Sequence, residues 1–579
     1  MNECSTSCPQ ECSYNQKIKK SKPHLENGPC LCNAGLVSEY TNSEFLDYHI
    51  CDLFNPRSGV QPLTLSIRII TRSHAVPFPC CPRSRSRSVN HGCLYYIKIQ
   101  IIRNFSAGRV LQAQRFVLKR KENTLFLKVA MKKIAVVFLL SQLLSQALGE
   151  DSNWSRWRGP NENGSVSTGS PPVEWSLTKN IRWKAELPGK GSSTPIIHGN
   201  QVIVLTSIET DKKKAGAESV ASTTPPASAP SPTGGDSPRR RGFGAPPPTN
   251  FFQFVVMSYD RVTGEKQWSK VVTEEVPHEA GHQTNNMASS SPITDGKHIY
   301  VDFGSRGIFC LDMLGNVKWQ KDLGEMTTIA SFGEGSSATL ADNLLVVPWD
   351  HEAGSFLVAF NATSGEEVWR TPRAEKTCWA TPLVVNHKGR SQVITNGRRV
   401  RSYDLKDGKL IWECGGQVSN PIPSPILVGG SVICMTGYQG NAIQSISLDS
   451  VGDVTGSNSI RWSNNEAAPY VPTATLYKGS LYFNKGNNNI ISCANAETGK
   501  LLFSQKRLEG LGTIYASPVA VADHIYFTGR DGMTVVVKHG KDLEIVSKNP
   551  LEEAIDGSLA VVGDTIYARG ERHLFCIGK

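Results

Sequence analysis

Two histidines four residues apart, His278 and His282, with Glu279 directly after the first, match the H-E-x-x-H pattern of zinc metalloproteases. That chemistry requires a helix, on which the two imidazoles share one face and the glutamate lies beside them as general base. Here Pro277 precedes the pattern, Gly281 lies inside it, and no apolar residue recurs at the helical period. The segment is therefore predicted to be a loop, and a metalloprotease is not the expected function.

A second metal hypothesis uses three consecutive polar residues, Asp350, His351 and Glu352. Imidazole and carboxylate groups bind divalent cations, and loops of neighbouring structural units can bring such groups together. We therefore treat His278, His282 and this triplet as weak candidate ligands of one shared cation. The alternative is that all five are ordinary polar residues of surface loops.

The elements that position these residues are short strands that recur along the chain. Segments such as SSSPITDGKHIYVDFGSRGIFCLD (289–312) and YASPVAVADHIYFTGRDGMTVVVKHG (515–540) share a small-residue start, an apolar strand, a turn, an alternating second strand and a third strand after another turn. A turn with glycine and an aromatic residue follow in most units, as in SGEEVW (364–369). Aligned on the proline of SSSP, the units begin at Pro195, Pro292, Thr339, Pro382, Pro425, Ala474, Pro518 and Leu559. Four short strands per unit, at a period of about 44 residues, predict a β-propeller.

The last unit ends at Lys579 without a fourth strand, whereas NIRWKAEL (180–187) supplies an unpaired one near the start. We therefore predict an all-β fold: an eight-bladed β-propeller with four-stranded antiparallel blades, the last blade closed by the N-terminal strand, so that no sheet edge is left open there. Recurrent aromatic residues are expected to pack between blades rather than to stack on a cofactor. They are Trp183, Trp268, Trp319, Trp369, Trp412, Trp462 and Phe503. One position in the third strand of the repeat is expected to need a small buried side chain, and it is occupied by Cys310, Cys493 and Cys576.

Only part of the chain has the composition of this propeller. Residues 1–130 hold nine of the 15 cysteines and a net charge of +10, and residues 131–149 have the basic start, apolar run and small-residue end of a secretory signal peptide. We interpret 1–130 as a spurious, disordered N-terminal extension, 131–149 as a signal peptide that starts at Met131 and is cleaved near Gly149, and 150–579 as the exported propeller, periplasmic or secreted. The alternative is a cysteine-rich cytosolic domain with an internal anchor.

Within the propeller, the Pro-, Ser-, Ala- and Gly-rich segment 209–250 is predicted to be a disordered insertion. Residues 150–579 have a net charge of −1, which gives no reason to expect nucleic acid as a partner. The apolar run of the signal segment is shorter than the about 20 residues that a membrane span needs, so no transmembrane helix is expected in the mature chain.

The repeats, together with NWSRWRGPNENG (153–164) and NIRWKAELPGKGSSTPII (180–197), resemble the pyrroloquinoline-quinone-like (PQQ-like) repeat propellers that bacteria export. The resemblance spans nearly all of 150–579 and is specific for fold rather than for function. It implies two classes: calcium- and quinone-dependent dehydrogenases, and binding proteins such as the outer-membrane assembly propeller. The resembling dehydrogenases often hold a disulfide of adjacent cysteines over the quinone. The only such pair here, Cys80-Cys81, precedes the signal segment.

Loops before the first strand and after the second strand of each unit are expected to surround the central opening on one face of the ring. Mixed polar and aromatic groups around a rigid hollow suit ligand or partner binding. The candidates are His282, Asn285, Glu334, Trp379, Arg306, Arg398, Tyr438 and Arg530. We therefore predict a monomeric, non-catalytic binding or scaffolding module for a protein partner or small ligand, with no cofactor expected. The alternative is a PQQ- and metal-dependent alcohol or sugar dehydrogenase, with PQQ and calcium as cofactors. Export would also allow a disulfide between Cys378 and Cys414, and the sequence does not decide whether it forms.

Overall fold

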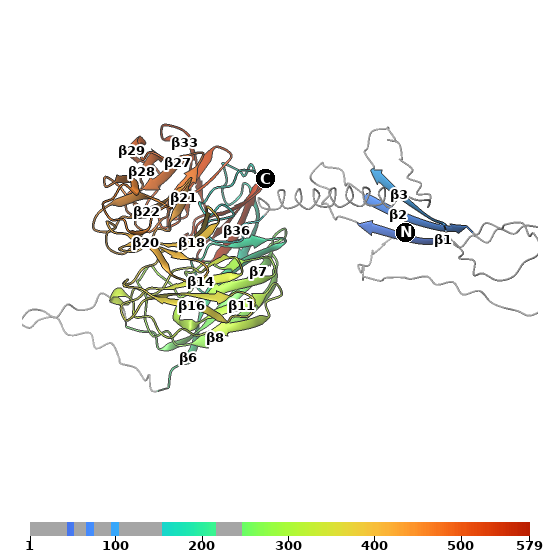
Figure 1. Cartoon of the computed structure of the whole chain (residues 1–579), viewed down its shortest axis with the longest axis horizontal. Coiled ribbons are helices and arrows are strands. Elements are labelled where there is room, and N and C mark those ends of the chain that lie inside the picture. The colour runs from blue at the N-terminus through green and yellow to red at the C-terminus, as the bar shows by residue number, and fades with distance from the viewer. Residues whose placement is uncertain (1–42, 51–64, 75–93, 104–152, 216–245) are drawn as a thin grey trace, which may run out of the picture. The chain divides into compact units, whose positions relative to one another are not determined.

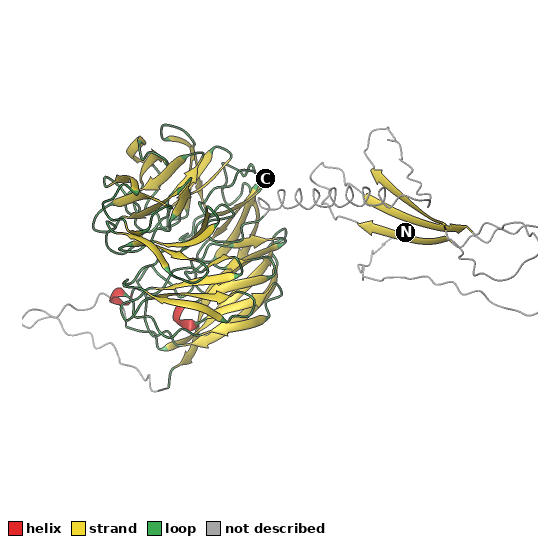
Figure 2. Ribbon diagram, viewed as in Figure 1, coloured by secondary structure: helices red, strands yellow, loops and turns green. Residues whose placement is uncertain are grey.

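The computed structural model describes residues 43–50, 65–74, 94–103, 153–215 and 246–579. The chain forms two compact units, Met1–Val137 and Phe138–Lys579. Strands dominate, and Figure 2 shows them in yellow with two short helical turns in red, η2 (Gly304–Arg306) and η3 (Ile329–Ser331). None of the helices in the described ranges is long and apolar enough to cross a membrane.

In the first unit, three described segments pair as an antiparallel sheet in the order β1 (Ser43–Ile50), β2 (Leu65–His74) and β3 (Leu94–Arg103). These three segments are therefore strands, although disorder is predicted for 1–130 from the sequence. The reason is local: β2, for example, reads LSIRIITRSH, and β-branched residues at alternating positions favour a strand whatever the composition around them. The other residues of 1–130, with Cys80-Cys81, and the predicted signal peptide, 131–149, lie outside the described residues.

The second unit, over 153–215 and 246–579, consists of eight sheets, each built on four antiparallel strands, which are the blades of the ring. Blade 1 contains β5 (Ile196–His198), β6 (Gln201–Lys213), β7 (Asn250–Asp260) and β8 (Lys266–Glu275). Blade 2 contains β9 (Ile293–Thr294), β10 (His298–Asp302), β11 (Ile308–Asp312) and β12 (Val317–Lys321). Blade 3 contains β13 (Thr339–Ala341), β14 (Leu344–Trp349), β15 (Phe356–Asn361) and β16 (Glu367–Pro372). Blade 4 contains β17 (Leu383–His387), β18 (Arg390–Thr395), β19 (Val400–Asp404) and β20 (Leu410–Cys414), with β24 (Gly452–Asp453) added in parallel at its edge.

The remaining blades follow the same order. Blade 5 contains β21 (Ile426–Val428), β22 (Ser431–Thr436), β23 (Ala442–Ser447) and β25 (Ile460–Asn464). Blade 6 contains β26 (Thr475–Tyr477), β27 (Ser480–Asn484), β28 (Ile490–Asn495) and β29 (Leu501–Arg507). Blade 7 contains β30 (Val519–Val521), β31 (His524–Thr528), β32 (Met533–Lys538) and β33 (Glu544–Pro550). Blade 8 contains β34 (Ala560–Val562), β35 (Thr565–Arg569), β36 (His573–Gly578) and β4 (Ile181–Glu186). The predicted eight-bladed propeller is confirmed.

The fourth strand of blade 8 comes from the N-terminal part of the unit. Strand β4 pairs antiparallel with β36, and Trp183 faces Cys576. Figure 1 shows the red C-terminal strand beside cyan strands from the start of the unit. Because the two ends of the unit share one sheet, blade 8 has the same four-stranded form as its neighbours.

The pairing registers correct one predicted unit start. In blade 2 Tyr300 pairs with Ile293, and in blade 3 Val346 pairs with Thr339; both Tyr300 and Val346 also face the small third-strand residue of their blade. Thr339 therefore corresponds to Ile293, and the third unit begins at Ala338. This unit has no proline at its start, and hydroxyl residues on both sides of Ala338 (Ser337 and Thr339) leave its alignment ambiguous.

The predicted insertion also starts later than residue 209. Strand β6 continues to Lys213 and β7 begins at Asn250, with Glu209 paired to Phe252. The segment 216–245 lies outside the described residues.

A small third-strand residue packs between two large neighbours in the blade. In blade 2 Cys310 faces Tyr300 on one side and Trp319 on the other, and Cys493 and Cys576 occupy the equivalent position in blades 6 and 8. The six cysteines of the described residues are all buried and free. A disulfide between Cys378 and Cys414 is therefore not formed.

The recurrent tryptophans pack between blades as predicted. Trp319 of blade 2 lies over the turn of blade 3 at Gly365, and its Nε1 donates to the carbonyl of Ala362 at 2.9 Å. Gly365 has a positive φ of 74°, and a Cβ there would come within 2.8 Å of the indole ring. The same contact recurs for Trp183 on Gly264, Trp268 on Gly315, Trp369 on Gly408 and Trp462 on Gly499. The glycine of one blade is thus the seat for the tryptophan of the blade before it.

Candidate functional site

A set of hydrogen bonds joins the blades around the ring axis. The residue two positions before each first strand carries a hydroxyl group, and in seven blades its oxygen accepts the backbone N–H of the equivalent residue in the preceding blade. The seven bonds run from Thr194 to Ser291 (3.0 Å), Ser291 to Ser337 (2.8 Å), Ser337 to Thr381 (3.1 Å), Thr381 to Ser424 (3.0 Å), Ser424 to Thr473 (2.9 Å), Thr473 to Ser517 (2.9 Å) and Ser517 to Ser558 (3.0 Å). We call these residues the hydroxyl ring. The hydroxyl ring explains why every repeat starts with small residues.

The segment 154–166 closes one end of the axial opening. It bonds through its backbone to first strands of blades 1, 2, 6 and 7: Trp154 with Ile197 (2.8 and 2.9 Å), Ser155 with Thr294 (3.0 Å), Asn163 with Leu476 (3.3 Å), and Gly164 and Val166 with Ala520 (2.9 and 3.1 Å). These blades lie on different sides of the ring, so the segment crosses the axis. We call it the plug.

Arg158 anchors the plug. Its guanidinium group is buried and donates to the carbonyls of Pro518, Asn163 and Ala474 and to the hydroxyl of Thr475, at 2.8 to 3.2 Å. All of these acceptors are neutral, and burial lowers the pKa of Arg158 to about 9. The side chain therefore links blades 6 and 7 to the plug from inside the ring.

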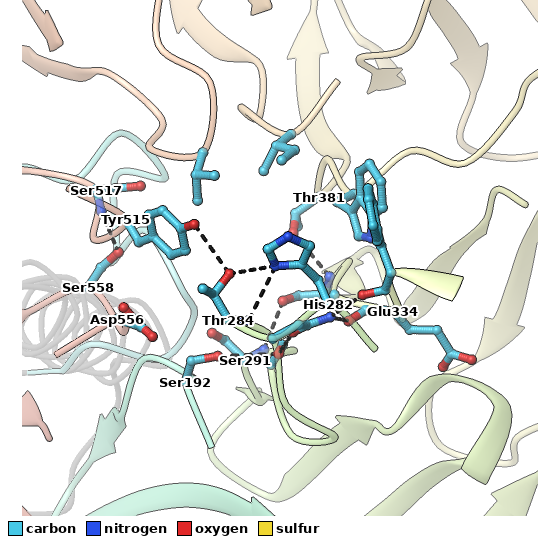
Figure 3. Close-up of a pocket in the computed structure, with 18 of the residues that line it drawn as sticks. Ser192, His282, Thr284, Ser291, Glu334, Thr381, Tyr515, Ser517, Asp556 and Ser558 are labelled. Atoms are coloured by element: carbon cyan, nitrogen blue, oxygen red, sulfur yellow. Dashed lines mark hydrogen bonds between the residues drawn. The ribbon is translucent and has the colours of Figure 1, made fainter. Parts of the chain in front are cut away.

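A cavity of about 390 Å³ lies at the axis, with the plug residue Trp157 among its lining. We call it the cup (Figure 3). Loops that precede the first strands form its wall, together with Tyr438 from the loop between β22 and β23. Its aromatic residues are Trp157, Phe332, Trp379, Tyr438, Tyr470 and Tyr515. Its hydroxyl-ring members are Ser291, Ser337, Thr381, Ser517 and Ser558. Its acid and imidazole groups are His282, Glu334 and Asp556.

The structure brings five of the predicted ring-face residues together at the cup: His282, Asn285, Glu334, Trp379 and Tyr438. The three arginines are not in its lining. Arg306 pairs with Glu275 at 2.9 Å, Arg398 is exposed, and Arg530 binds Asp556 through two contacts of 2.6 and 3.0 Å. Arginine side chains are long enough to reach partners beside the opening. A repeat alignment places the residue in a loop but gives no information on where its side chain points.

The loop that contains His282 reaches across the mouth of the cup. Nδ1 of His282 accepts from the hydroxyl of Thr284 (2.8 Å) and from its backbone N–H (3.2 Å). The same Thr284 hydroxyl contacts the hydroxyl of Tyr515 at 3.2 Å, as Figure 3 shows. The loops that enter blades 2 and 7 are thereby joined over the ring.

The two carboxyl groups of the cup lining already have partners. Glu334 turns away from the cup toward blade 2, where its oxygens accept from the backbone N–H (2.7 Å) and the hydroxyl of Ser305. Burial raises the pKa of Glu334. Asp556 is held by Arg530, whose guanidinium also lies 4.3 Å from the ring centre of Tyr515. Both carboxyl groups are thus engaged within the protein, Glu334 by the neutral donors of Ser305 and Asp556 by an arginine.

The five candidate ligands of a shared cation serve separate contacts in the structure. His278 donates from Nε2 to the carbonyl of Met326 (2.6 Å), and its Nδ1 accepts from Arg306 (2.7 Å). Asp350 pairs with Arg373 (2.8 Å), His351 accepts from the backbone of Thr327 (3.1 Å), and Glu352 accepts from Thr377 (2.8 Å). In the described part of the chain, no three His, Cys, Asp or Glu side chains are grouped to hold a metal ion. The H-E-x-x-H segment lies in a loop, as predicted.

Several residues of the cup escaped the prediction. Trp157 belongs to the plug, and the repeat gave no sign that the segment before the first blade enters the ring. The hydroxyl ring had a signal, since a Ser or Thr lies two positions before the first strand in all eight units. That regularity was interpreted as a demand for small size alone. Asp556 and Thr284 carried no signal, because their loops differ from unit to unit.

Comparison with known proteins shows which families share this architecture. Residues 325–528 match a family model described as outer membrane protein assembly factor BamB. The protein is a PQQ-like repeat β-propeller. Among solved structures, BamB from Moraxella catarrhalis has 15% identity and a TM-score of 0.41, covering 56% of this chain and 89% of its own. Quinohemoprotein alcohol dehydrogenase from Comamonas testosteroni has 9% identity and a TM-score of 0.50, covering 74% and 81%. No curated protein matches the sequence of this propeller. At these identities the structural likeness shows the fold alone.

The cup of this propeller does not supply a calcium site for a quinone. Calcium binds about six to eight oxygen ligands, carboxylates foremost. Both carboxyl groups in the lining, Glu334 and Asp556, have their oxygens engaged by Ser305 and Arg530. We therefore derive no reaction step through such a cofactor.

Proposed function

We propose that this propeller is a non-catalytic binding module and that the cup is its ligand site. The observation that carries the proposal is the state of the ionisable groups in the lining. A general acid or base must reach the reacting atom with a proton or a lone pair. Nδ1 of His282 is held by Thr284, Glu334 points away, and Asp556 is bound by Arg530. Aromatic faces, hydroxyl groups and Nε2 of His282 remain, and the lining has no second available acid or base to act with that imidazole.

Two further points support this role. The description of the matching family names an assembly factor, which agrees with binding rather than catalysis. The signal-peptide features of 131–149 agree with export to the periplasm or the medium. We include an exported location in the proposal.

The experiment compares a cup-filling variant with a matched surface variant of the full chain. Ile422 is half-buried in the cup lining, so Ile422→Trp places an indole in the ligand space. Val451 is 78% exposed and lies outside the lining, so Val451→Trp introduces the same ring at the surface. Ligand-observed NMR with neutral sugars, small carboxylates and aromatic compounds measures binding to both variants and to the unmodified protein.

A compound that binds the unmodified protein and Val451→Trp, but not Ile422→Trp, supports the cup as a ligand site. Binding that survives in Ile422→Trp overturns it. The enzyme alternative is tested in parallel by adding PQQ, calcium and a primary alcohol or sugar with an artificial dye. Substrate-dependent reduction of the dye overturns the non-catalytic assignment, whereas no reduction supports it.

A further inference from the structure

The hydroxyl ring has hydrogen-bonding capacity that the fold does not use. Each hydroxyl oxygen from Ser291 to Ser558 accepts one backbone N–H, and a hydroxyl group also carries one hydrogen to donate. Among the described residues, none of the ring hydroxyls donates a hydrogen bond to a protein acceptor. These donors are nearly all buried, so each favours an acceptor brought by a ligand or water.

The free donors surround the inner end of the cup. Five of them line it, and they come from blades 2, 3, 4, 7 and 8, which lie around the axis: Ser291, Ser337, Thr381, Ser517 and Ser558. A ligand that satisfies them needs oxygen acceptors around its whole edge. An apolar ligand would leave the donors buried without partners, which opposes its binding.

Aromatic faces form the rest of the wall. Tyr438 and Tyr470 stack on one another with ring centres 4.8 Å apart, and Trp379 is fixed by the bond of its Nε1 to the carbonyl of Gly333 at 2.8 Å. Flat rings held in this way pack against the C–H face of a ligand. The cup thus combines apolar faces on its wall with donors at its inner end.

Charge and size restrict the ligand further. Glu334 is turned to Ser305, Asp556 is bound by Arg530, and the lining contains no Lys or Arg, so no available charge in the lining compensates an ionised ligand. A cavity of about 390 Å³ is at the small end of the range of about 300 to 1,000 Å³ found for ligand pockets. One or two small rings fill it.

We propose that the cup binds a neutral carbohydrate, as a free mono- or disaccharide or as the end of a glycan. A sugar ring has oxygen acceptors around its edge and C–H groups on its faces, which match the hydroxyl ring and the aromatic wall. This inference rests on the proposed binding function and names the ligand class for the same site.

The test uses the full chain and isothermal titration calorimetry with glucose, galactose, maltose and cellobiose. Glucuronate and glucose 6-phosphate are the charged counterparts, and benzoate and indole are the non-sugar probes. Thr381→Val removes one free donor while nearly keeping the shape, and Thr381→Ser restores the hydroxyl. Tyr438→Leu removes an aromatic face, and Tyr438→Phe keeps it. Melting temperatures are recorded for all variants, because the Thr381 oxygen also accepts the backbone N–H of Ser337.

We expect at least one neutral sugar to bind, about tenfold more weakly in Thr381→Val and near the unmodified level in Thr381→Ser. Tyr438→Leu should weaken binding about fivefold and Tyr438→Phe should not. If only glucuronate, phosphate esters, benzoate or indole bind, and Ile422→Trp blocks them, the sugar assignment is overturned while the binding function stands. If Ile422→Trp blocks nothing that binds, both fail.

Discussion

Replacing Gly365 by alanine should loosen the seam between blades 2 and 3 without touching the cup. Gly365 has a φ of 74°, and a Cβ there would lie 2.8 Å from Cγ and Cδ2 of Trp319, where ordinary contact begins at 3.4 Å. An L-residue in the left-handed conformation costs about 1 to 2 kcal/mol. Displacing a packed ring costs about 1 to 3 kcal/mol more. We expect the free energy of unfolding to fall by about 2 to 5 kcal/mol.

Gly479 is the matched control. Its φ of 76° is nearly the same, and nothing lies within 4 Å of the position its Cβ would take. Gly479→Ala therefore carries the backbone cost alone, about 1 to 2 kcal/mol. The difference between the two variants measures the contact with the tryptophan.

The assay is equilibrium denaturation of the full chain in guanidinium chloride, followed by tryptophan fluorescence and circular dichroism. A double-mutant cycle with Trp319→Ala isolates the contact, because Gly365→Ala should then cost no more than Gly479→Ala. Equal destabilisation by the two glycine variants in the unmodified background would refute the role given to the glycine as a seat for the ring. A persistent difference in the Trp319→Ala background would refute it as well.

Three other predictions test the core, the titration of a buried acid and the location of the protein. The pKa of Asp302 is raised to about 7, mainly by burial, so the folded state holds the carboxyl proton of Asp302 more tightly than the unfolded chain does. The stabilisation from this protonated carboxyl group is present below pH about 4 and is lost as the pH rises through about 7. The free energy of unfolding of Asp302→Asn, relative to that of the unmodified protein, should therefore rise by up to about 4 kcal/mol between these pH values. Denaturant titrations measure this difference, and a value that stays constant with pH would contradict the assignment. Burial also raises the pKa of three thiols to about 12, so alkylation of the native protein at pH 8 with iodoacetamide, followed by peptide mapping, should leave them unmodified until denaturant is added: Cys310, Cys493 and Cys576. Export predicts that the protein expressed from Met131 is recovered outside the bacterial cytoplasm with an N-terminus near Glu150, as intact-mass spectrometry would show; an uncleaved cytoplasmic product would contradict it.

The repeat made the fold predictable because each unit spells out its own local structure. The Tyr–Cys–Trp arrangement of Tyr300, Cys310 and Trp319 follows from alternation along short strands, and glycine marks the turns. The units at Ala474 and Leu559 lack the proline and are still placed correctly. The one misplaced unit, at Thr339, also has hydroxyl residues on both sides of its true start, Ala338. Local pattern therefore sets strand, turn and period, and fails by one residue where two neighbouring positions fit the pattern equally well.

The cup was predictable only in outline. The repeat places His282 and Trp379 in loops on one face, and both line the cavity. It does not say that Arg306 turns to Glu275, or that Glu334 turns to Ser305, because side-chain direction depends on neighbours from other blades.

The sequence by itself determined the propeller, its eight units and the face on which the long loops lie, since these follow from short-range patterns of apolar residues, glycine and hydroxyl groups. The tertiary structure alone decided that 154–166 crosses the axis, that the ring hydroxyls keep free donors, and that Glu334 and Asp556 are engaged by Ser305 and Arg530. Arg158 shows why: its acceptors Ala474 and Pro518 lie more than 300 positions away in the sequence, and only closure of the ring brings them within hydrogen-bonding distance.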